Sequence, residues 1–146
     1  MLVRITIEGA SPEFERKLLE LLAEHREELA VSVDTAWNVE RAVQYLASLP
    51  SNALTFARLV VDADGDKSAE ELRTAFDGQL RGPTIALSRA IGRGERRNWW
   101  PKGLDAPIYP HYDPNHISWE KAIAYRMTAD NVAIFREAFN RIIDTE

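Results

Sequence analysis

The sequence predicts a mainly helical α+β fold, and three features of the chain support this prediction. The N-terminal segment alternates apolar and polar residues with a period of two, as a strand buried on one face does. Most of the remaining chain consists of segments with apolar residues at helical spacing. Two short extended segments near the C-terminus predict a β-hairpin before the last helix.

The composition of the 146-residue chain is that of an ordinary globular protein, with 45% hydrophobic and 28% charged residues. No apolar run approaches the roughly 18 residues needed to cross a bilayer, and the first residues lack the order of a signal peptide. We therefore expect a cytoplasmic protein with no membrane partner. The chain has no cysteine, which excludes disulfides, thiolate zinc sites and cysteine nucleophiles.

A β-α-β unit is predicted at the N-terminus. Residues 2–8 form the first strand, and Ser11 caps a helix that has Pro12 at its first position. The pattern changes at residues 29–33 to a short second strand. The two strands are expected to be parallel if they share a sheet.

Two helices are expected to follow and to form a platform for the next pair. Asp34 or Thr35 would cap the first, which ends before Pro50. Ser51 or Asn52 would begin the second, which is apolar on most sides and therefore central.

The acidic run of residues 62–66 is similar to the start of a calcium-binding EF-hand loop. Lys67, however, occupies the position where the sharp turn requires glycine, and Arg73 the position of the bidentate carboxylate. A solvated loop explains these residues better than a calcium site.

Two helical patterns separated by a break occupy residues 68–97. Ser68 with Glu71 forms a capping box for the first. Turn-forming residues 77–79 follow, and Gly82 and Pro83 are expected to open the second helix, because proline is tolerated at the first helical position.

The second of these helices has an apolar side and a polar, cationic side. Leu87 and Ile91 lie on the core side. Between Arg81 and Lys102 there are six basic residues and one acid, so this segment carries +5 although the whole chain carries −5. The local charge favours an anionic partner. The face of this helix opposite to Leu87 and Ile91 carries Thr84, Ser88, Arg89 and Arg93.

A hairpin and a final helix complete the predicted elements. The strands of the hairpin come from residues 107–112 and 122–127, and prolines confine the first strand to a sheet edge. Residues 113–116 read as the turn between them. Thr128 or Asp130 would cap the last helix, whose broad apolar face runs to Ile143.

The order of these elements, from Trp37 to Ile143, resembles a bacterial winged helix-turn-helix domain. The resemblance implies a main domain of residues 35–146, with the β-α-β unit of residues 1–34 packed on it as an extension. It implies a transcription-regulator-like protein that binds double-stranded DNA. The residues implied in contact with DNA are Arg81, Thr84, Ser88, Arg89, Arg93, Arg96, Arg97, Lys102 and His116.

Other chemistry has weaker support in the sequence. His111, Asp113 and His116 could gather around a metal, but a proline-rich surface loop accounts for them better. No phosphate-binding loop, nucleophile elbow or metalloprotease motif is present. We therefore predict no enzyme, no catalytic residue, no metal and no cofactor. Trp99 and Trp100 are adjacent and cannot both face a ligand, so at least one is expected in the core.

Two further expectations concern partners. A non-catalytic adaptor module on the same scaffold, which contacts a protein instead of DNA, is the alternative function. A homodimer is expected because the last helix and the first strand, with Val3 and Ile5, offer more apolar surface than one small core can cover.

Overall fold

The computed structural model describes residues 6–25, 34–115 and 121–144. These residues form six helices and one three-stranded antiparallel sheet, so the fold is α+β and mainly helical, as predicted. The predicted strands at 2–8 and 29–33 lie largely or wholly outside the described residues. In chain order the elements are α1 (Pro12–Glu24), α2 (Val39–Ala47), α3 (Ser51–Asp62), β1 (Asp66–Ser68), α4 (Ala69–Ala75), α5 (Arg81–Arg96), β2 (Tyr109–His111), β3 (Ala124–Arg126) and α6 (Ala129–Asp144).

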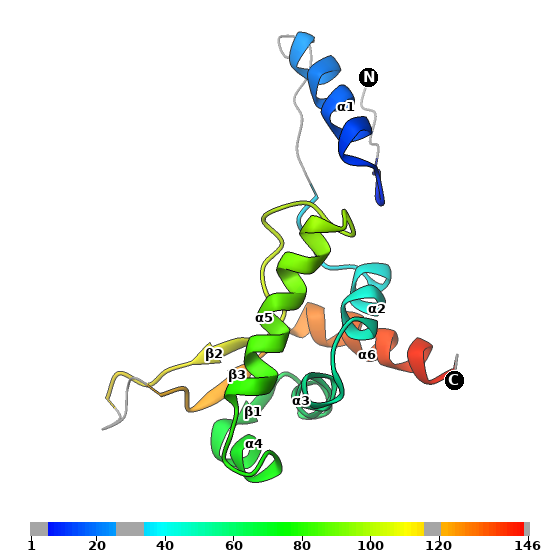
Figure 1. The fold of residues 1–146 in the computed structure, drawn as a ribbon. Coiled ribbons are helices and arrows are strands. Elements are labelled where there is room, and N and C mark those ends of the chain that lie inside the picture. Colours follow the sequence, from blue (N-terminus) through cyan, green and yellow to red (C-terminus); the bar gives the residue numbers. More distant parts are fainter. Residues whose placement is uncertain (1–5, 26–33, 116–120, 145–146) are drawn as a thin grey trace.

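Helix α1 stands clear of the other helices (Figure 1). Ser11 caps it as predicted, accepting a hydrogen bond from the Phe14 backbone N–H. None of its residues is buried. No other described element packs extensively against it, and Leu19 and Leu21 are each about half exposed.

The segment before α1 contacts the body through Glu8 and Gly9. A carboxylate oxygen of Glu8 lies 3.0 Å from Nε of Arg41 on α2. The Gly9 backbone N–H donates to the carbonyl of Asn98, just after α5.

Helix α2 begins later than the sequence suggests. Asn38, and not Asp34 or Thr35, is its cap, accepting a hydrogen bond from the Arg41 N–H at 2.8 Å. The guanidinium of Arg41 is buried and donates to the carbonyls of Asp34 and Ala36. These bonds hold the preceding segment extended, so the helix cannot begin before Asn38.

Helix α3 is central, as predicted. Its buried residues are Ala53, Phe56, Ala57, Val60 and Val61. Helix α5 packs on one side of it and α6 on another, while α2 packs mainly against α6 (Figure 1). Phe135 of α6 is fully buried and Phe139 is 7% exposed, so this part of the face of the last helix is covered within the chain. Ile143, near the end of the same face, stays 47% exposed, and further exposed apolar side chains lie on α1.

The sheet contains one strand that the sequence reading missed. Residues 66–68 form β1, which pairs antiparallel with β3, although Asp66 was expected in a solvated loop and Ser68 only as a helix cap. The strand order is β1-β3-β2, with Asp66 and Tyr109 both opposite Arg126. Gly65 allows the chain to enter β1 because its φ of 85° is a left-handed conformation that other residues rarely adopt.

Two helices and a tight turn follow the first strand. Ser68 caps α4 as predicted, accepting from the Glu71 N–H at 3.1 Å. The turn holds Asp77 and Gly78 at positive φ. Helix α5 begins at Arg81, earlier than the predicted start at Pro83. The predicted hairpin is present as β2 and β3.

Aromatic rings occupy the core where α2, α5 and α6 meet. Trp37 lies 5.2 Å from Tyr45, 5.5 Å from Trp100 and 5.1 Å from Phe135, measured between ring centroids. Trp100 is buried and Trp99 half-buried, in agreement with the expectation that one of them joins the core. Within the described residues, no helix is both long and apolar enough to span a membrane.

Candidate nucleic-acid interface

Helix α5 is fixed to the core by one apolar side and two hydrogen bonds to its backbone. Pro83, Leu87, Ala90 and Gly94 are its buried residues. The buried Tyr45 hydroxyl donates to the Leu87 carbonyl at 3.0 Å, and Trp100 Nε1 donates to the Ile91 carbonyl at 3.1 Å. The rest of the helix therefore presents a defined outer face to solvent.

Four exposed residues of α5 are polar or cationic: Arg81, Ser88, Arg89 and Arg96. Their spacings of seven or eight residues place them on one side of the helix, because two turns contain about seven residues. At 1.5 Å per residue, Arg81 and Arg96 lie about 22 Å apart along the axis. We call these four residues the outer face of α5.

The outer face is positively charged and unneutralised within the described part of the chain. None of its three arginines has a carboxylate oxygen within 4.0 Å among the residues that the structure describes. The Arg96 side chain lies over Gly92, where a β-carbon would be 3.1 Å from its guanidinium nitrogen. The glycine thus leaves space for the arginine along the helix surface.

Two predicted site residues of α5 are engaged elsewhere. Thr84 is half-buried, and its hydroxyl donates to the Leu80 carbonyl at 2.7 Å within the first turn. Arg93 turns towards α2, where it donates to the Ser48 carbonyl at 2.9 Å. Neither residue belongs to the outer face on which the sequence analysis placed it. The bond to Ser48 could not be read from the sequence because 45 residues separate the two.

The remaining predicted contacts separate in space. Arg97 caps the C-terminus of α5 and lies with its guanidinium 5.3 Å from the centroid of the Trp99 ring, on the side facing α2. Lys102 is exposed in the loop that follows. His116 lies outside the described residues.

The hairpin projects outward from the helical body (Figure 1). Its described part exposes Tyr109 and Tyr112, which are 42% and 47% accessible. The Asp113 carboxylate accepts from the Asn115 backbone N–H at 2.9 Å, so this acid closes a local turn. Burial raises the pKa of the Tyr125 hydroxyl on β3, the Tyr112 hydroxyl adds to this rise, and the Arg73 charge opposes it.

Metal binding has no support in the described residues. No group of three or more histidine, aspartate or glutamate side chains is close enough there to hold an ion. His111 is half-buried on β2 and His25 is exposed after α1.

Comparison with known proteins gives no match. No protein-family model, no curated protein and no solved structure is significantly similar to this chain.

Proposed function

We propose that this chain is a winged helix-turn-helix protein that binds double-stranded DNA. The order of elements from α3 to β3 supports the winged plan: helix, strand, helix, helix and hairpin, with the first strand paired to the last. On this plan α4 and α5 are the helix-turn-helix pair, α5 is the recognition helix, and the β2–β3 hairpin is the wing.

The outer face of α5 is the observation that carries the proposal. Its three arginines are exposed, lie on one side of the helix, and have no acidic partner among the described residues. DNA carries one negative charge per about 1.7 Å of its axis, and its major groove is wide enough for an α-helix. Such a face binds DNA favourably even though the whole chain has a net charge of −5.

The geometry suggests separate roles along this face. Ser88 and Arg89 lie near the middle of α5 and would contact base edges, where an arginine can donate two hydrogen bonds to guanine. Arg81 and Arg96 lie near the two ends and would contact phosphates. Arg93, because of its bond to Ser48, is not assigned to base reading. In this proposal the protein is cytoplasmic and non-catalytic.

A mobility-shift titration with duplex DNA at several salt concentrations tests the proposal. Arg81→Ala with Arg96→Ala should weaken binding to all sequences and reduce the salt slope by about 0.9 per lost phosphate contact. Arg89→Ala should change the preference between sequences by about 1–3 kcal/mol.

Arg58→Gln is the matched control, because it removes one positive charge from α3, where the guanidinium lies over the Phe139 ring of α6. It should leave the salt slope unchanged. Failure of the wild-type protein to bind any duplex at low salt would reject DNA binding and favour the adaptor function.

We also propose that the protein is a homodimer in which α1 pairs with α1 of a second copy. Two ion pairs, Arg16–Glu20 and Lys17–Glu13, lie along the polar side of this helix. Among the residues that the structure describes, no other element packs extensively against the apolar side, which would match itself across a two-fold axis. A dimer would present two recognition helices to two half-sites.

A further inference from the structure

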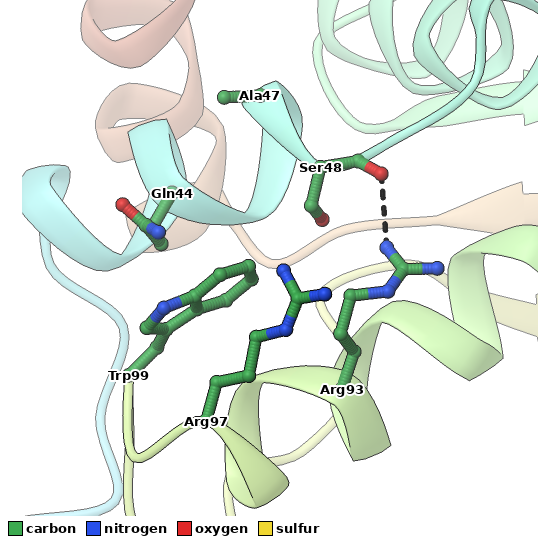
Figure 2. A pocket seen from close by; sticks show the side chains of 6 residues that line it. All are labelled: Gln44, Ala47, Ser48, Arg93, Arg97 and Trp99. Carbon is green, nitrogen blue, oxygen red and sulfur yellow. Dashed lines mark hydrogen bonds between the residues drawn. The ribbon is translucent and has the colours of Figure 1, made fainter.

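A hollow of about 340 Å³ lies between the C-terminal end of α5 and the end of α2 (Figure 2). It is separate from the outer face of α5, because it opens on the side of the helix that faces α2. Its walls are formed by Gln44, Ala47, Ser48, Arg93, Arg97 and Trp99. We call it the α2–α5 hollow.

Arg93 is held in position in this hollow. Its guanidinium donates to the Ser48 carbonyl at 2.9 Å, drawn as the dashed line in Figure 2. The Ser48 hydroxyl donates to the Tyr45 carbonyl and so fixes the same turn. A guanidinium has five N–H donors, and this contact uses one of them.

Arg97 reaches the same hollow from the next turn of α5. Figure 2 shows both guanidinium groups extending towards α2, with Trp99 beside Arg97. The ring of Trp99 lies 5.3 Å from the Arg97 guanidinium carbon and supports it from one side. Two side chains, one anchored to a carbonyl and one against an aromatic ring, are thereby brought to one site.

The two positive charges have no counter-ion within the described chain. Neither arginine has a carboxylate oxygen within 4.0 Å among the described residues. Two like charges beside one hollow repel each other, and an anion between them would relieve this repulsion. Phosphate suits the site because its oxygens match the fork of guanidinium donors.

We infer that the α2–α5 hollow binds a phosphate group between Arg93 and Arg97. The hollow is open to solvent on one side, so a group esterified to the phosphate can extend out of it. The phosphate can come from the DNA backbone, in which case the inference rests on the proposed function, or from a small phosphate ester. In both cases the same two guanidinium groups bind the oxygens.

Isothermal titration calorimetry with phenyl phosphate at low ionic strength tests the small-ester source. Arg97→Gln should weaken binding about tenfold, because a charge-assisted hydrogen bond is lost. Arg89→Gln removes the same charge from the outer face and should change the affinity less than twofold. Arg97 is exposed, so its replacement should leave the melting temperature unchanged, which circular dichroism checks.

A duplex titration of the same variants tests the DNA source. If phenyl phosphate does not bind but Arg97→Gln reduces the salt slope for duplex by about 0.9, the phosphate belongs to DNA. If phenyl phosphate binds and no duplex does, the inference holds while the proposed function fails. Equal weakening by Arg97→Gln and Arg89→Gln in calorimetry would show general charge attraction and overturn the site. The absence of both phenyl phosphate binding and an effect on duplex binding would overturn it as well.

Discussion

The indole ring of Trp100 lies directly against the backbone of Gly94, in the space that a β-carbon at position 94 would occupy. Gly94 is therefore needed for packing, although it lies inside a helix, where glycine is normally unfavourable. The contact joins α5 to the loop that follows it. The Trp99 backbone N–H also donates to the Gly94 carbonyl at 2.8 Å.

Gly94→Ala should destabilise the protein by about 1–3 kcal/mol, because the added methyl group forces the buried Trp100 to move. Urea unfolding measures the change. Gly82→Ala is the control, since the nearest atom to its β-carbon would be Asn52 Nδ2 at 3.4 Å. That variant should be neutral or up to about 1 kcal/mol more stable. An equal loss in both variants would contradict the packing role of Gly94.

Tyr45 makes stability depend on pH in the alkaline range. Burial raises the pKa of its hydroxyl above the ordinary value of about 10. The stabilising contribution of the neutral Tyr45 hydroxyl is therefore fully present below about pH 10. It is lost as pH rises further, because this hydroxyl ionises first in the unfolded chain. Tyr45→Phe should lower the free energy of unfolding at pH 7 by about 1 kcal/mol, through loss of the bond to Leu87, and should make its decline above pH 10 shallower.

Urea unfolding between pH 7 and pH 11 measures both effects. Tyr109→Phe, at an exposed tyrosine, is the comparison and should leave the alkaline decline as in the wild type. A Tyr45→Phe protein with an unaltered decline would show that other groups cause it.

Phe139 and Leu21 should respond differently to a negative charge. Phe139 is 7% exposed in the core, so Phe139→Asp should unfold the protein, because burial of a charged group is costly. Leu21 is 53% exposed on α1, and Leu21→Glu should leave the melting temperature nearly unchanged.

The oligomeric state of the Leu21→Glu protein tests the proposed dimer. Light scattering should give a dimer for the wild type and a folded monomer for this variant. A wild-type monomer at micromolar concentration would rule out self-pairing through α1, and another protein would then be the partner to seek.

Glu8 should stabilise the body through Arg41 even though it precedes α1. Arg41 is 3% exposed, so Glu8→Gln leaves a buried charge whose nearest other carboxylate, on Asp34, is 4.0 Å away. The expected loss is about 1–2 kcal/mol, between the values for surface and buried pairs. Glu13→Gln breaks an exposed pair with Lys17 and should cost less than about 0.5 kcal/mol in urea unfolding. Equal losses of unfolding free energy in the two variants would show that the burial of Arg41 does not strengthen its ion pair with Glu8.

Local signals predicted much of the fold. Ser11 and Ser68 cap helices as expected, since each cap needs only an N–H three residues away. The start of α2 was predicted wrongly because Arg41, a later residue, holds the preceding carbonyls. Strand β1 was missed because its three residues gain strand structure only by pairing with β3, which lies far along the chain.

In the candidate site, too, local spacing was predictable from the sequence and contacts between distant segments were not. Helical spacing was enough to place Ser88 and Arg89 on an exposed side of α5. It could not show that Arg93 bonds to Ser48, or that Gln44 and Ser48 of another segment complete a hollow with it. Those relationships depend on how α2 packs beside α5.

The ring cluster around Trp37 has an optical consequence. Centroid separations of 5.1–5.5 Å to Phe135, Tyr45 and Trp100 are short enough for their electronic transitions to couple, which gives near-ultraviolet circular dichroism bands. The rings come from four segments, so these bands disappear only when α2, α6 and the loop after α5 separate. Trp99 lies outside the cluster's centre and beside the α2–α5 hollow, so its emission responds to an occupant there. Near-ultraviolet circular dichroism thus reports on global opening, and a change in the emission of the four tryptophans, to which Trp99 contributes, reports on occupancy of the hollow.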